Sequence, residues 1–202
     1  MPEEHALLSA SGAHRWLNCT PSARLEEQFP DSVSEYAEEG TLAHSLAELK
    51  LKKYLTVMKP SVFKKELKVI QDNALYTAEM NACTDDYLEF VKDVLAEYPK
   101  KPYVAIEQRL DFSHVAPEGF GTGDCVVIGG DTITIIDFKF GRGVPISAQD
   151  NPQMKLYALG ALAVFSLLYE IKHVKMIIFQ PRLNNISTAE NTANELFKWA
   201  EE

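Results

Sequence analysis

Cysteine is scarce in this chain: only Cys19, Cys83 and Cys125 are present, at spacings that make neither a disulfide framework nor a self-contained zinc site. A membrane span is lacking too, since the longest apolar stretch, residues 156–169, falls short of the roughly 20 apolar residues that a transmembrane helix needs. The N-terminus has neither the basic start nor the cleavage site of a secretory signal. These absences predict a cytoplasmic protein with reduced thiols and no membrane partner.

Positive charge is also in short supply, because the formal net charge is -9 at pH 7. A simple electrostatic nucleic-acid binder usually has a basic patch or stripe, so this balance counts against that class. Basic residues do gather in one stretch, and such runs are most often the solvated face of a helix. The residues of this run are Lys50, Lys52, Lys53, Lys59, Lys64, Lys65 and Lys68.

No internal repeat, low-complexity segment or Gly/Ser-rich linker divides the 202 residues, of which 46% are hydrophobic, and this predicts a single domain. We expect a helical N-terminal part over residues 1–69, a core over residues 70–180, and a C-terminal tail with a helix over residues 181–202. The tail has no helix-stop signal, which leaves open whether the natural protein extends past Glu202.

Helical periodicity predicts two long helices in the first half of the chain. The second runs from about Ile70 to Pro99, which ends it because proline cannot continue a helix. A later helix begins at Asn151 and Pro152 and is apolar almost all round until about Tyr169, which predicts burial. The first helix has apolar residues at near-helical spacing: Leu42, Leu46, Leu49 and Tyr54.

Between these helices the pattern changes to strands. Residues 103–112 alternate, with Glu107 on the face opposite to the apolar residues. Residues 124–128 and 132–140 flank Gly129-Gly130-Asp131, which is typical of a β-hairpin, and the apolar run 174–180 predicts a core strand. The order of helix, three strands, helix and strand indicates an α/β (α+β) fold with a central mixed sheet flanked by helices. The apolar residues of the first strand are Val104, Ile106, Leu110 and Phe112.

The hairpin register places two carboxylates opposite each other. A two-residue loop at Gly130-Asp131 pairs Asp124 with Asp137, whose Cβ atoms would then lie about 4.5–5.5 Å apart on one face. Like charges at that separation are destabilising unless a cation compensates them. Lys139 follows on the same face, about 6.6 Å along the strand. A surface hairpin with an exposed charge pair is the alternative interpretation.

Two carboxylates and one ammonium suit phosphodiester hydrolysis. Carboxylates hold a divalent metal that polarises a phosphoryl oxygen and lowers the pKa of bound water. A positioned lysine orients the attacking water or neutralises developing charge. The pattern therefore favours a metal-dependent nuclease.

The same residues carry a family resemblance. Gly121-Thr122-Gly123-Asp124 and Ile135-Ile136-Asp137-Phe138-Lys139 resemble the G-x-x-D and (D/E)-x-K core of PD-(D/E)XK nucleases. Gln153 and Tyr157 resemble the Q-x-x-x-Y motif of the RecB-like exonuclease branch, and Gly40-Thr41-Leu42-Ala43-His44 resembles its G-x-x-x-H helix. The resemblance, to phage-associated members in particular, covers residues 9–180. It implies a restriction-endonuclease-like αβββαβ core with extra N-terminal helices.

The resemblance also implies roles for individual residues. His44, Asp124 and Asp137, with the main-chain carbonyl of Phe138, would bind Mg²⁺ or Mn²⁺, and a histidine ligand favours Mn²⁺. Lys139 would be the catalytic lysine, with Glu107, Asp124 and Asp137 as the active-site acids, while Gln153 and Tyr157 would bind nucleic acid near a helix N-terminus. From the residues alone, a structural role is favoured for His44, and close approach of another backbone explains Gly40. For Gln153 and Tyr157 two interpretations stay open: a shared helix face that suits a phosphate, or a surface glutamine and a core tyrosine.

Cys19 belongs to a second similar segment. Trp16-Leu17-Asn18-Cys19-Thr20-Pro21 resembles the N-terminal part of RecB-like nucleases whose first cysteine joins three C-terminal ones around a [4Fe-4S] cluster. Such a cluster needs four thiolates, and the three partners are absent from this sequence. We expect no iron–sulfur cluster in this chain.

The expected function is exonucleolytic hydrolysis of DNA in phage or bacterial replication, recombination or repair. One alternative is a catalytically silent module that binds DNA or a phage replication partner, which the acidic net charge favours. A site-specific endonuclease would need a separate base-reading element, and the sequence shows no sign of one.

Overall fold

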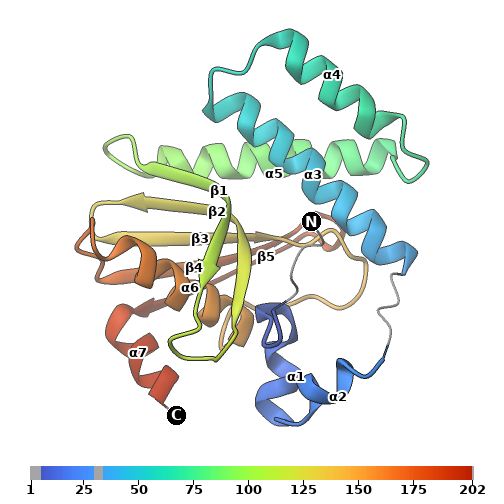
Figure 1. Cartoon of the computed structure of the whole chain (residues 1–202). Coiled ribbons are helices and arrows are strands. Elements are labelled where there is room, and N and C mark those ends of the chain that lie inside the picture. The colour runs from blue at the N-terminus through green and yellow to red at the C-terminus, as the bar shows by residue number, and fades with distance from the viewer. Residues whose placement is uncertain (1–5, 30–33, 202) are drawn as a thin grey trace.

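The computed structural model describes residues 6–29 and 34–201, which form a mixed α+β fold around a five-stranded sheet (Figure 1). The strands lie in the order β1-β2-β3-β4-β5; only β3 and β4 are parallel, and the other neighbours are antiparallel. Their bounds are β1 Tyr103–Asp111, β2 Phe120–Gly129, β3 Thr132–Phe138, β4 His173–Gln180 and β5 Asn185–Thr192.

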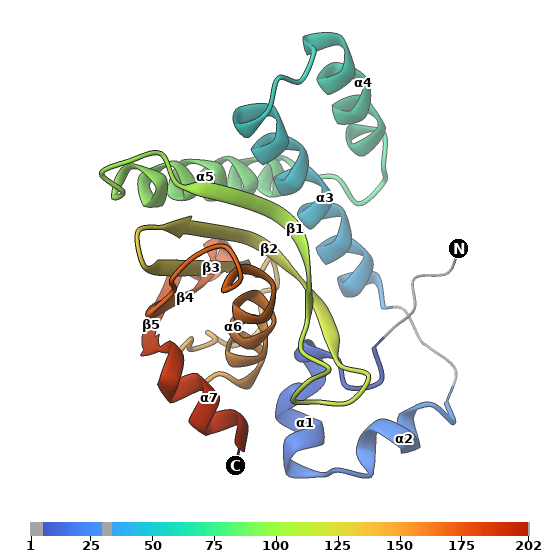
Figure 2. The same ribbon diagram turned by 60° about the vertical axis from the view of Figure 1, so that its left-hand side comes forward.

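Helices cover both faces of the sheet. α3 and α5, with α4 beyond them, lie on one face, and α6 and α7 lie on the other (Figures 1 and 2). Short N-terminal helices close the end of the molecule near α6. The helices are α1 Ala13–Asn18, α2 Ser22–Glu26, α3 Glu35–Leu55, α4 Pro60–Gln71, α5 Ala78–Ala96, α6 Pro152–Phe165 and α7 Ala193–Glu201, with 3-10 turns η1 Ala10–Gly12 and η2 Pro181–Leu183. The expected fold class and the order α5-β1-β2-β3-α6-β4 are confirmed.

The central hairpin has the expected register. Pairing runs from Gly129 with Thr132 to Cys125 with Ile136 across a two-residue loop, and Gly130 adopts a φ of 62°, which a residue without Cβ adopts at little cost. Alternate residues of β3 enter two separate cores: Ile135 packs toward α6, and Ile136 packs toward α3 and α5. Both faces of the sheet are therefore buried.

Three expectations need correction. The helix from Ile70 to Pro99 is two helices, because the Thr77 hydroxyl accepts a hydrogen bond from Met80 N–H and starts α5 afresh. The basic run is not one solvated face, since Lys50 is buried and bonds to Asp85. The tail over residues 181–202 contributes an edge strand, β5, which periodicity missed because Ala189 is its only fully buried residue.

Strand β1 also differs from the expected alternation. Val104 and Ile106 pack on the α3 and α5 side, whereas Leu110 and Phe112 belong to the core on the α6 side. The exchange of faces occurs at Glu107, whose backbone lies in the left-handed region with a φ of 48°. A non-glycine residue there costs of order 1–3 kcal/mol, and such strain tends to lie at functional sites.

The start of α6 is as expected. The Asn151 side chain accepts a hydrogen bond from Met154 N–H, and Pro152 occupies the first turn. The helix is buried almost all round but ends at Phe165, four residues before Tyr169.

Within the described ranges, none of the helices is both long and apolar enough to cross a bilayer. The N-terminal start, from which the absence of a secretory signal was inferred, lies outside the described residues.

Candidate metal centre

The β1–β2 hairpin curls away from the end of β3 (Figures 1 and 2). A hollow of about 760 Å³ is lined by residues of this region. Its walls come from the segment before α1, from α3, from the first three strands and from the start of α6. The charged, amide and aromatic side chains that line it are His44, Glu107, Arg109, Phe120, Asp124, Asp137, Lys139, Gln153 and Tyr157. Every side chain predicted for the site therefore lines one hollow, whereas Phe138, predicted through its main-chain carbonyl, is not among the lining residues.

Strand pairing places three carboxylates in a row. The pairs Ile106–Cys125 and Gln108–Gly123 set Glu107 opposite Asp124. On the other side of β2, the ladder with β3 ends at the step before Asp124 and Asp137, and Phe138 N–H donates to Asp124 Oδ2 over 2.6 Å. The two aspartates thus share one pocket, as the register predicted.

A histidine from the helical part completes a set of three possible metal ligands. His44 on α3, Glu107 on β1 and Asp124 on β2 offer donor atoms within 4.8 Å of one another. His44 Nδ1 lies 3.1 Å from Asp124 Oδ1, and the His44 ring packs edge-on against Phe138. Asp137 lies in the same pocket but outside this set, so the structure brings Glu107 closer to the histidine than the sequence interpretation did.

Asp137 and Lys139 are linked through α6. Lys139 Nζ lies 3.1 Å from Asp137 Oδ2 and donates to Gln153 Oε1 over 3.1 Å. The other end of the Gln153 amide donates to Asp137 Oδ1 over 3.3 Å and to the Tyr157 hydroxyl over 3.2 Å. Gln153 therefore fixes the relative positions of the carboxylate and the ammonium.

Burial and mutual repulsion destabilise the ionised form of the carboxylates in this pocket. Burial, with the Asp124 carboxylate next in effect, raises the pKa of Glu107 to about 7. Burial also raises the pKa of Asp137 to about 6, although Lys139 opposes the shift. Burial lowers the pKa of His44, but Asp124 and the other two carboxylates outweigh it and bring the value to about 9. Such a cluster favours positive charge.

A family model described as "Protein of unknown function (DUF2800)" matches residues 5–202, nearly the whole chain. This chain belongs to DUF2800. A solved structure titled "Crystal structure of SSO0001" is similar over 81% of this chain and 85% of that chain, with 15% sequence identity and a TM-score of 0.32.

The predicted nucleic-acid residues of this DUF2800 member are turned inward. Tyr157 is buried against Gly121, and the polar atoms of Gln153 bond within the site. Contact of either residue with DNA stays a prediction, as does the Phe138 carbonyl as a ligand. Sequence reasoning missed Arg109 and Phe120, which also line the hollow. Their proximity to Glu107 and Gly121 along the same strands was the available signal.

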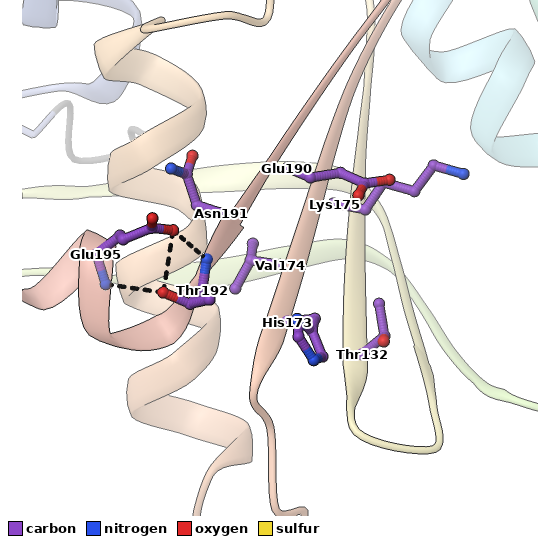
Figure 3. A pocket seen from close by; sticks show the side chains of 8 residues that line it. All are labelled: Thr132, His173, Val174, Lys175, Glu190, Asn191, Thr192 and Glu195. Carbon is purple, nitrogen blue, oxygen red and sulfur yellow. Dashed lines mark hydrogen bonds between the residues drawn. The ribbon is translucent and has the colours of Figure 1, made fainter.

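A second hollow, shown in Figure 3, lies at the opposite end of β3, beside Thr132 and His173. Its hydrogen bonds belong to the start of α7: Thr192 N–H donates to Glu195 Oε2, and Glu195 N–H donates to the Thr192 hydroxyl. This reciprocal pair is a capping box, which satisfies the first amides of a helix. Thr192 and Glu195 therefore stabilise the start of α7. The hollow lies far from Glu107, Asp124 and Asp137.

Two glycines of the motifs behave differently, and the expectation for Gly40 is wrong. Among the described residues, a Cβ on Gly40 would meet nothing within 4 Å, so no backbone in that part of the chain approaches it. A Cβ on Gly121 would lie 2.6 Å from Tyr157 Cε1. The missing side chain at Gly121 is what lets the buried tyrosine ring pack against β2.

We therefore expect opposite effects of one added methyl group. Gly121→Ala should destabilise the fold by about 1–3 kcal/mol through overpacking. Gly40→Ala should stabilise it by up to about 1 kcal/mol, because alanine favours a helix interior. Urea unfolding of both variants without metal measures the two free energies. Equal effects of the two substitutions would contradict this account of the pocket wall.

Proposed function

We propose that this chain is a Mg²⁺- or Mn²⁺-dependent deoxyribonuclease of the PD-(D/E)XK type, similar to the RecB-like exonucleases. One observation carries the proposal: Glu107, Asp124 and Asp137 lie in a row across adjacent strands, with His44 and Lys139 at the same pocket. Like charges so close are destabilising in the absence of a cation. The sequence motifs supply the reaction class.

The residues fit a divalent metal. The donor set of one imidazole and two carboxylates within 4.8 Å suits a transition-type divalent ion such as Mn²⁺, and Mg²⁺ is compatible with the oxygen ligands. Asp137 Oδ2 is buried and pairs with Lys139 Nζ over 3.1 Å, and among the described residues it accepts no further hydrogen bond. His44, Glu107, Asp124 and Asp137 would hold the metal. When bound, it would polarise the phosphoryl oxygen and acidify a water molecule.

The remaining side chains prepare the pocket for phosphodiester hydrolysis. The ammonium of Lys139, held by Gln153 and Asp137, faces the same hollow and is placed to stabilise negative charge that develops on the phosphoryl group. Gln153 and Tyr157 brace this arrangement from α6. We assign Lys139 the catalytic role and Gln153 a positioning role.

A DNA substrate also agrees with a cytoplasmic location, where the three free thiols would stay reduced. We assign the enzyme to DNA replication, recombination or repair and expect it to digest from strand ends. Phage proteins of the same processes are the proposed partners.

A degradation assay tests the proposal. The purified chain, stripped with EDTA, should leave linear DNA intact and should degrade it once Mg²⁺ or Mn²⁺ is added. Covalently closed circular DNA should survive, because it offers no end. Asp124→Ala is the matched control and should remain inactive with either metal. DNA binding without cleavage by the metal-loaded wild type would instead support the silent module.

A further inference from the structure

The mouth of the candidate metal centre carries a stacked cationic and aromatic pair. The Arg109 guanidinium lies 3.7 Å from the centroid of the Phe120 ring, on neighbouring strands where Arg109 pairs with Thr122. Arg109 is exposed, and within the described residues it makes no ion pair. By contrast, Arg142 and Arg182 both pair with Glu79. One face of a stacked guanidinium plane remains available for a further planar group.

This pair separates two hollows. Arg109 and Phe120 line the metal-centre pocket of about 760 Å³ and also an adjoining pocket of about 420 Å³. A strand leaving the carboxylates toward the second hollow would pass over the pair. The second hollow contains Asp111 and Glu118, which repel phosphate but can accept hydrogen bonds from the edge of a base. The pair is thus better placed for a base than for a phosphate alone.

The size of the pocket suits a single nucleotide. Its walls come from the segment before α1, from α3, from three strands and from α6. Pockets of roughly 300–1,000 Å³ accommodate a ligand of drug-like size, which matches a nucleotide. Single-stranded nucleic acids are bound by stacking bases on aromatic rings or on arginine planes.

We propose that Arg109, braced by Phe120, forms a stacking platform for the base next to the scissile phosphate, and that the enzyme takes its substrate as a single strand. This inference rests on the proposed nuclease function and extends it to the form of the DNA. Arg109 acts through its plane as well as its charge, so lysine cannot replace it.

Binding without metal tests the platform apart from cleavage. With EDTA present, fluorescence anisotropy of labelled oligothymidylate, an abasic strand of equal length and a blunt duplex gives three dissociation constants for the full chain. We expect the tightest binding to oligothymidylate. Arg109→Lys should weaken that binding by about 10-fold, the scale of one lost stack, and should leave the abasic strand nearly unaffected. Arg142→Lys, the same substitution at an exposed arginine outside both hollows, should alter none of the three.

Two results would overturn the inference: wild-type binding of oligothymidylate by Arg109→Lys, or binding of duplex as tight as that of the single strand. Added Mn²⁺ separates this inference from the function on which it rests. If the wild type cleaves DNA but Arg109→Lys binds oligothymidylate normally, the stacking platform is refuted and the nuclease function stands. If the expected binding pattern is found without any cleavage, the nuclease function is refuted and a single-strand binding site stands.

Discussion

Replacing Lys139 with alanine should lower the rate of DNA cleavage by about 10²–10³-fold and leave Mn²⁺ affinity intact or slightly higher. The reason is the division of roles in the pocket. Lys139 bonds to Gln153 and pairs with Asp137, but it is not itself a ligand, so its loss removes a positive charge near the metal without removing a donor. Asp137 keeps its contact with the Gln153 amide, which preserves the local arrangement.

Asp124→Ala should fail in a different way, by losing Mn²⁺ binding and cleavage together. Asp124 is the member of the candidate ligand set that contacts both His44 and the Phe138 N–H. Its removal takes away an anionic metal donor and also the contacts that hold His44 and the end of β3 in place. Asp137→Ala should likewise lose both. Calorimetric Mn²⁺ titration beside a DNA-degradation time course measures the two properties for each variant.

Lys175→Ala, on the neighbouring strand outside this pocket, is the control for loss of a lysine. It should match the wild type in both assays. Equal loss of Mn²⁺ binding in Lys139→Ala and Asp124→Ala, or near-normal cleavage by Lys139→Ala, would show that the lysine has been assigned the wrong role.

The second large effect is expected at Arg182, far along the chain from the motifs. Its guanidinium lies over the Phe140 ring at 3.6 Å and donates to Glu39 on α3 over 2.7 and 3.0 Å and to Glu79 on α5 over 3.0 Å. The Arg182 side chain is only 5% exposed. It therefore joins the helix that carries His44 to the segment that follows Lys139.

Arg182→Ala should lower the free energy of unfolding by about 2–3 kcal/mol, less than for a fully buried pair because both glutamates are partly exposed. Arg182→Lys should recover little of this, since an ammonium cannot form the same fork of hydrogen bonds. Arg142→Ala, which removes an exposed arginine paired with the same Glu79, is the matched control and should cost less than about 1 kcal/mol. Urea unfolding without metal gives all three values. Similar losses of stability in Arg182→Ala and Arg142→Ala would contradict the role of Arg182 in joining α3 to the segment after Lys139.

Local patterns by themselves determined the centre of the molecule. Gly130-Asp131 fixed a two-residue turn, and strand alternation then fixed which side chains share a face, so Asp124 and Asp137 could be placed together from sequence. The start of α6 at Asn151 and Pro152 could also be predicted from sequence, because helix capping depends on residues adjacent in the chain. Periodicity was less reliable at Thr77 and along β5, where a local cap and a polar edge strand overrode it.

Only the tertiary structure decided how distant segments meet. That His44 lies with Glu107 and Asp124, and that Arg182 binds α3, depends on the packing of helices against the sheet over long sequence separations. The left-handed backbone at Glu107 makes the side chains of β1 change from one face of the sheet to the other. A strict alternation with a period of two could not indicate this change. Sequence patterns encode the nearest neighbours of a residue, whereas a site of this kind is assembled from side chains whose positions are fixed by the packing of the whole sheet.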